Sequence, residues 1–385
     1  MMPVDLTPED ALRINVLLAS PIEAIRIDES RMTLYALSQK GEAKVQLNPN
    51  CRDDTYLRRV RETLSSHVLG SPGGYPVYLK RWTRMGQARD EVLESLLMLG
   101  EPEAVVAVVN ATGVTDELAR RAWWASQTSE NARCMLQQAA VVNGEMGAVL
   151  ADFLVEFLPF EEEACNQIKT VSLVLQGNLV DEKVRSGLWQ KGRLKNAYLV
   201  GFLHTLPDDL PDLHAGHPDR ERIAGQLAGL LAEQNPFAEQ LCRLLSPAGQ
   251  TYLACVEAVL KKPSNQDVMV ELLCALEAYS ARLPLRKQRK FDMSEVVRVS
   301  SGFNGDSDAG QACMNAAAGQ CLQALFRVLP DDEYYIRAML FLAMLGEPVL
   351  DPVFSRTDAI GTVMRKKLKP VTEPMHEQIE VLRQS

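Results

Sequence analysis

The chain lacks the sequence features by which the commonest functional classes of protein are recognised. In its 385 residues no uninterrupted apolar run reaches the roughly 18–20 residues of a transmembrane helix. Its N-terminus has acidic residues before the first apolar run and no basic segment, unlike a signal peptide. There is also no GxSxG, HExxH, P-loop or dinucleotide-binding motif. We therefore expect a cytoplasmic protein that is not an enzyme, and predict no catalytic or cofactor-binding residue.

Excess positive charge and clustered cysteines are absent as well. The 41 Lys and Arg residues are outnumbered by 50 Asp and Glu residues, for a net charge of −9, which disfavours a dedicated nucleic-acid binder. The eight cysteines form no CxxC pair, so most are predicted to be free thiols in the core. Contents of 46 % hydrophobic and 24 % charged residues are those of an ordinary globular protein.

The first 86 residues predict a small α+β cap. Thr7-Pro8-Glu9-Asp10 has the composition of a helix start, with a capping threonine, a proline at the first helical position and acids in the first turn. Three short alternating runs follow, at 23–29, 32–38 and 43–47. Their alternation and the polar residues between them predict an antiparallel meander.

From residue 87 to 281 the apolar residues recur at helical spacing with short breaks, and we predict an array of helices. The pentapeptide MLGEP occurs twice, at Met98–Pro102 and Met344–Pro348. In both copies we expect Gly to end one helix in a left-handed conformation and Glu-Pro to start the next. Such corners resemble the turns of HEAT-like repeats. The predicted fold is therefore mainly α, an irregular HEAT-like array of helical hairpins behind the α+β cap.

Residues 282–312 are basic and then rich in glycine, and we predict a linker or exposed loop there, followed by a C-terminal helical segment at 313–385. The basic run can bind phosphates or an acidic partner, although a solvated face is the simpler interpretation. The candidate interaction residues are Arg282, Arg286, Lys287, Arg289 and Lys290. A second basic run comprises Arg365, Lys366, Lys367 and Lys369.

Two further groups of residues have chemistry to consider. His204, His214 and His217 lie in or beside a loop with an HxxH pair, but its prolines favour a polar connection over a zinc site, and we predict no metal site. A sulfur carrier needs one exposed cysteine of low pKa. The candidates are Cys51, Cys313 and Cys321, for which buried thiols are the simpler interpretation.

One resemblance to a known family covers about residues 7–205 and continues less distinctly toward 280. The stretch from EAIRIDESRMTLYALSQKGEAKVQL through YLKRWTRMGQARDEVLESLLMLGEPEAVVAVV, followed by TDELARRAWWA, resembles the sulfur-reduction protein DsrS family. That family is encoded with the reverse-acting dissimilatory sulfite reductase system of sulfur-oxidising bacteria. The family has no catalytic motif to transfer. The resemblance implies a cytoplasmic accessory protein of sulfur metabolism.

Three functional hypotheses follow. The leading one is a non-enzymatic accessory or regulatory protein of sulfur oxidation that acts through contacts with other proteins. The second is a thiol-based sulfur-handling protein that uses an exposed cysteine. The third is RNA binding through the basic segment 282–290, which the acidic composition disfavours but does not exclude.

Overall fold

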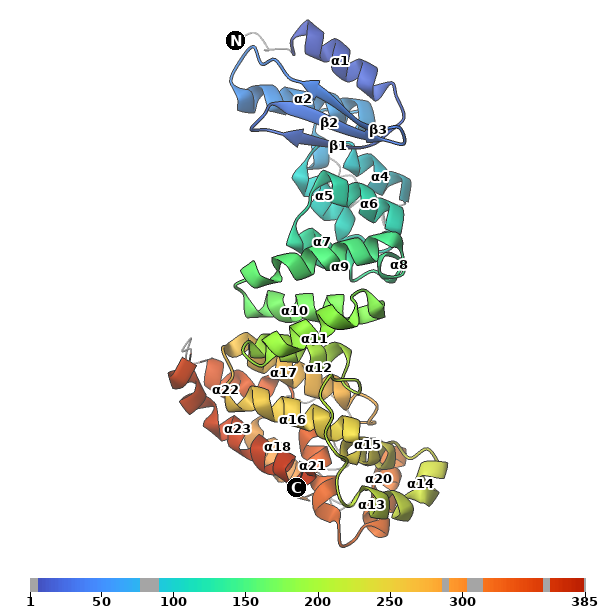
Figure 1. Cartoon of the computed structure of the whole chain (residues 1–385), viewed down its shortest axis with the longest axis vertical. Helices are drawn as coiled ribbons and strands as arrows, with labels where there is room; N and C mark the ends of the chain where they lie inside the picture. Colours follow the sequence, from blue (N-terminus) through green and yellow to red (C-terminus); the bar gives the residue numbers. More distant parts are fainter. Residues whose placement is uncertain (1–5, 77–89, 286–290, 303–313, 356–360, 384–385) are drawn as a thin grey trace. The chain divides into compact units, whose positions relative to one another are not determined.

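The computed structural model describes residues 6–76, 90–285, 291–302, 314–355 and 361–383 (Figure 1). Its internal contacts divide the chain into two compact units, Met1–Phe157 and Leu158–Ser385.

The first unit begins with the predicted cap. Helix α1 (Pro8–Leu18) is followed by strands β1 (Ile22–Asp28), β2 (Thr33–Ser38) and β3 (Gly41–Gln46), and then by helix α2 (Asp53–Leu69). The strands form an antiparallel sheet in the order β1-β2-β3. Helices α1 and α2 cover one face of it, because Ile25, Leu34, Ala36 and Val45 lie in one core cluster with residues of both helices. Alternation along each strand places these side chains on a single face.

The opposite face of the sheet meets a helix that carries two consecutive tryptophans. Trp123 is buried, whereas the indole N–H of Trp124 donates to Glu42 on β3 at 3.0 Å. Arg26 on β1 lies over the ring of Trp124, at 5.0 Å from its centroid. One tryptophan is therefore a core residue, as expected from its apolar ring, and the other keeps its polar edge near the surface.

The rest of the first unit consists of short helices that pack mainly on their neighbours along the chain. Pairs form between α4 and α5, between α5 and α6, and between α9 and both α7 and α8 (Figure 1). Their bounds are α4 Asp90–Leu97, α5 Pro102–Val109, α6 Asp116–Ala125, α7 Ser129–Met135, α8 Ala139–Val142 and α9 Glu145–Phe157.

The two copies of MLGEP fold differently. Gly100 adopts the predicted left-handed conformation (φ 65°) between α4 and α5. Gly346 is instead extended (φ −165°, ψ 175°), and Glu347-Pro348 starts a short 3-10 helix, η3 (Glu347–Leu350). The prediction of a left-handed turn is thus correct for the first copy and wrong for the second. Glycine permits both conformations, so the packing around each corner decides between them.

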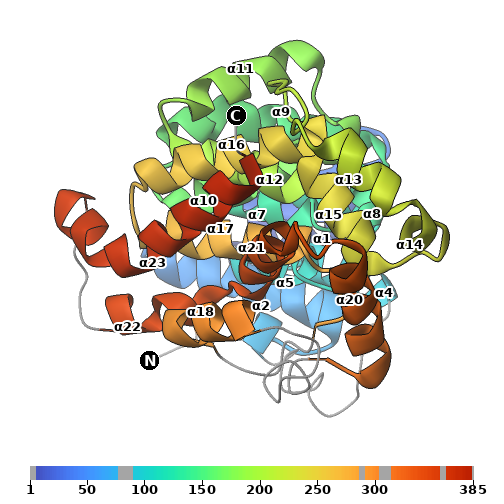
Figure 2. The same ribbon diagram turned by 90° about the horizontal axis from the view of Figure 1, so that it is seen from below.

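Within the residues described, all regular elements of the second unit are helices. The last of them, α23, packs on α16 and α21 (Figure 2). Its first helices are η1 Leu158–Phe160, α10 Ala164–Val174, η2 Gln176–Asn178, α11 Glu182–Gly192, α12 Asn196–Thr205, α13 Arg220–Gln226 and α14 Ala228–Ala232. These are followed by α15 Pro236–Leu245, α16 Pro247–Lys261, α17 Gln266–Tyr279, α18 Met293–Gly302, α20 Ala316–Val328, α21 Glu333–Met344, η3, α22 Asp351–Phe354 and α23 Gly361–Arg383.

Helix α12 is the centre of this unit. Seven consecutive residues, Ala197–Leu203, are buried, because α10, α11, α16 and α17 all pack around it. A helix that is apolar on every side is expected in the interior. Gly201 lets α10 approach closely, since a Cβ atom there would lie 2.7 Å from Val171.

Two segments near the C-terminus differ from what the sequence patterns suggest. Within the predicted linker at 282–312, Met293–Gly302 is helix α18, and its Val296 and Val299 are buried. The linker prediction is therefore wrong for these ten residues, whose apolar spacing is that of a helix. Helix α23 continues through Pro370 and Pro374, which usually interrupt helices. The buried side chains Met364, Leu368, Val371 and Met375 hold it against its neighbours.

The fold class matches the prediction: a mainly α protein with a small antiparallel α+β cap at its N-terminus. Among the helices in the described parts of the chain, none is both long enough and apolar enough to cross a bilayer.

Candidate functional site

The predicted basic segment is described only in part. Arg282 is exposed directly after α17, whereas Arg286, Lys287, Arg289 and Lys290 lie outside the described residues. The interaction role of this segment therefore stays a prediction.

The candidate thiols occupy ordinary positions. Cys51 is half-buried beside the core of the cap, and its thiol donates to the carbonyl of Arg52 at 3.7 Å. Cys321 is half-buried on α20, and Cys313 lies outside the described residues. Among the cysteines that the structure describes, only Cys165 on α10 is exposed, and the sequence did not single it out.

The surroundings of Cys165 do not activate it. Partial burial raises the pKa of its thiol, and the nearby carboxylates of Glu271 and Asp267 raise it further. Burial also raises the pKa of Cys242, Cys255 and Cys274. Because the thiolate is the nucleophile, a raised pKa makes a thiol less reactive near neutral pH.

His204, in the last turn of α12, and the loop residues His214 and His217 have separate partners. His204 Nε2 lies 3.1 Å from Glu271 Oε2, and the backbone N–H of His214 donates to Thr251 Oγ1 at 3.0 Å. His217 is buried against the ring of Tyr335, and its Nδ1 accepts a hydrogen bond from the backbone N–H of Asp219 at 3.1 Å. Within the described residues, no group of three or more His, Cys, Asp or Glu side chains is placed to hold a metal ion.

The glycine-rich loop that follows α2 binds a carboxylate of the protein itself. The backbone N–H of Tyr75 donates to Glu101 Oε2 at 3.0 Å, and a Cβ atom on Gly74 would lie 2.3 Å from Glu101 Oε1. Burial raises the pKa of Glu101, which is the acid of the first MLGEP copy. The loop thus serves as a structural contact for the start of α5.

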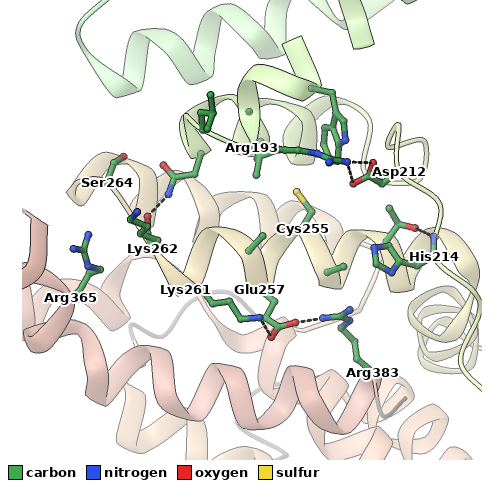
Figure 3. Close-up of a pocket in the computed structure, with 18 residues that line it drawn as sticks. Arg193, Asp212, His214, Cys255, Glu257, Lys261, Lys262, Ser264, Arg365 and Arg383 are labelled. Atoms are coloured by element: carbon green, nitrogen blue, oxygen red, sulfur yellow. Dashed lines mark hydrogen bonds and ion pairs between the residues drawn. The ribbon is translucent and has the colours of Figure 1, made fainter. Parts of the chain in front are cut away.

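A concave surface lies along α16 in the second unit, and we call it the α16 groove. Its volume is about 770 Å³, within the range of about 300–1,000 Å³ typical of binding pockets. Helix α16 forms its floor, the α11–α12 turn lies on one side and α23 on the other (Figure 3). The lining residues of α16 include Ala254 and Ala258, one turn apart. Their short side chains leave the floor hollow.

Two internal ion-pair systems line the α16 groove. Arg193 donates to Asp212 at 3.0 Å on one side of α16 (Figure 3). On the other side Glu257 accepts from Lys261, at 2.7 Å, and from Arg383 of α23. Partial burial opposes ionisation of Glu257, but the hydrogen bond from Lys261 and the charge of Arg383 outweigh it, so that its pKa is lowered. Both carboxylates of the lining are therefore held by cations of the protein.

Two further cations of the lining have no carboxylate partner among the described residues. Lys262 is exposed at the end of α16, and its carbonyl, not its ammonium group, accepts a hydrogen bond from Asn196. Arg365 on α23 donates only to the hydroxyl of Thr362, at 3.0 Å. Leu194, in the α11–α12 turn on the side opposite α23, is 91 % exposed. The groove therefore combines free positive charge with a solvent-exposed apolar side chain.

The sequence indicated only one part of this site. Arg365 belongs to the second basic run, but Arg193, Leu194 and Lys262 lie up to about 170 positions away along the chain, with nothing in the local pattern to connect them. The return of α23 onto α16 brings these segments together.

The comparisons with protein-family models, curated proteins and solved structures gave no match to this chain.

Proposed function

We propose that this protein is a non-enzymatic accessory protein of dissimilatory sulfur oxidation that acts by binding another protein in the α16 groove. The assignment to sulfur oxidation rests on the resemblance of residues 7–205 to the DsrS family. The assignment of a binding role rests on the groove, which contains an exposed leucine and two cations without a carboxylate partner among the residues that the structure describes. A concave surface of this volume, lined by apolar side chains and a few charged groups, is a candidate binding site.

The groove is equipped for binding. Arg193, Lys261 and Arg383 are held by carboxylates of the protein, Lys262 is exposed and Arg365 is half-buried. The thiol within the lining, Cys255, is buried with a raised pKa. A helical scaffold supports the lining residues, and rigid elements are suited to presenting a fixed recognition surface.

Site-directed photo-crosslinking tests the proposal. A photoreactive amino acid replaces Leu194 in the full chain, which is expressed in a sulfur-oxidising bacterium growing on reduced sulfur. We expect crosslinks to a component of the sulfite reductase system, identified by mass spectrometry. Leu12 on α1, which is 65 % exposed, provides the control position in the other unit. Equal crosslinking from both positions, or a partner unrelated to sulfur oxidation, would contradict the proposal.

A further inference from the structure

The α16 groove is positively charged in a chain that is negative overall. Its lining has five Lys or Arg side chains and two Asp or Glu side chains, an excess of three positive charges, whereas the chain as a whole carries −9. Charge of one sign gathered in a hollow attracts ligands of the opposite sign. The groove is therefore selective for an anionic occupant.

The arrangement of the charges indicates the size of that occupant. Asp212 and Glu257 already bind Arg193, Lys261 and Arg383, which leaves Lys262 and Arg365 to meet an incoming anion. Figure 3 shows Lys262 and Arg365 toward one end of the groove, whereas the paired Arg193 and Arg383 lie toward the other. An occupant that meets the two cations at one end and follows the length of the groove is longer than a single phosphate. A peptide segment with carboxylates near one of its ends has these properties.

The apolar part of the lining indicates the second property of the occupant. Leu194 is 91 % exposed, and Leu199, Ala254 and Ala258 line the same groove. Covering a leucine side chain removes apolar surface from water and so strengthens binding. A polyanion without apolar groups, such as an RNA backbone, would leave this surface in water.

We propose that the α16 groove binds an acidic segment of a partner protein in which carboxylates flank a large apolar side chain. This inference rests on the proposed function and names the chemistry of the partner. The carboxylates of the segment contact Lys262 and Arg365, and its apolar side chain covers Leu194. The internal ion pairs of Asp212 and Glu257 hold the remaining cations in place. Opposite charges on the segment and on the groove increase the rate of association and the specificity more than they increase the affinity.

The test measures binding of a fluorescently labelled synthetic peptide, in which glutamates surround a central leucine, to the full-length protein by fluorescence anisotropy. We expect the double charge reversal Lys262→Glu, Arg365→Glu to weaken binding by about tenfold or more, with a smaller dependence on salt. Leu194→Ser should weaken it by about tenfold through lost apolar contact. The matched control is Lys366→Glu, Lys367→Glu, which reverses two exposed charges of α23 outside the lining and should change binding by less than about twofold.

Three results would overturn the inference. The first is equal binding of a peptide in which lysine replaces every glutamate. The second is a full effect of the control variant, which would indicate general attraction to basic α23. The third is displacement of the peptide by inorganic phosphate or by single-stranded RNA together with no effect of Leu194→Ser. If the acidic peptide fails but Leu194 still crosslinks to a sulfite reductase component in cells, this inference is wrong and the proposed function stands.

Discussion

Replacing Asp10 by alanine is expected to destabilise the N-terminal cap strongly, although this residue looks like an ordinary acid in the first turn of a helix. The side chain of Asp10 is fully buried. One carboxyl oxygen accepts from the backbone N–H of Asn48 at 2.7 Å and from the hydroxyl of Tyr56 at 2.5 Å. Asp10 thereby ties α1 to the end of the sheet and to α2.

The expected magnitude follows from these two bonds. Removing the acceptor leaves a backbone N–H and a phenol hydroxyl buried with fewer partners, at about 1–3 kcal/mol each. We therefore expect Asp10→Ala to lower the free energy of unfolding by about 3–5 kcal/mol, a large fraction of the about 5–15 kcal/mol of a typical domain. Tyr56→Phe should cost about 1–2 kcal/mol, because Asn48 keeps its bond. The hydroxyl of Tyr56 also lies 3.1 Å from Thr7 Oγ1, which limits the loss in Asp10→Ala.

Urea unfolding followed by circular dichroism measures these changes in the free energy of unfolding. The double variant Asp10→Ala, Tyr56→Phe measures the interaction energy between the two side chains. Because the two side chains share a bond, their effects should be non-additive by about 1–2 kcal/mol. The control is Glu9→Ala, the neighbouring acid, whose side chain is 63 % exposed and pairs only with Arg13. Its replacement should cost less than about 0.5 kcal/mol. If Asp10→Ala and Glu9→Ala lowered the free energy of unfolding equally, both residues would act only as acids of the first helical turn. That result would refute the stabilising role of the hydrogen bonds from Asn48 and Tyr56 to Asp10.

Three other predictions concern the second unit. Gly201→Ala should lower the free energy of unfolding by about 1–3 kcal/mol, because the new Cβ would lie 2.7 Å from Val171. Gly187→Ala should raise the free energy of unfolding by about 0.5–1 kcal/mol, because the space around Gly187 is open. Thermal denaturation compares the two variants. Burial lowers the pKa of His217 from its ordinary 6.5. The imidazole of His217 therefore binds a proton more tightly in the unfolded chain than in the folded one, so the free energy of unfolding should fall as the pH drops below 6.5. In His217→Gln, the free energy of unfolding measured in urea should depend less on pH in this range. In native alkylation with iodoacetamide, followed by mass spectrometry, exposed Cys165 should react before buried Cys255; a faster reaction of Cys51 or Cys321 would instead favour the sulfur-handling hypothesis.

Local signals in the sequence were sufficient for the cap and for most helices. Thr7 caps α1 and Pro8 opens it, because capping and the fixed φ of proline depend only on neighbouring residues. The alternation of the three early runs gave the sheet and its order. The same kind of rule failed at Gly346, where an identical pentapeptide adopts an extended turn, and at Pro370 and Pro374, where burial of one helix face outweighs two missing hydrogen bonds.

The sequence by itself determined the fold class, since the 3.6-residue and two-residue periods of apolar side chains specify helices and strands without reference to distant residues. Only the tertiary structure decided where the site lies. Leu194, Lys262 and Arg365 line one groove because α12 and α23 both pack on α16. The packing of α23 on α16 depends on apolar surfaces that match across more than 100 positions. Hydrophobic burial is not directional, so periodicity reveals which face of a helix is buried but not which helix covers it.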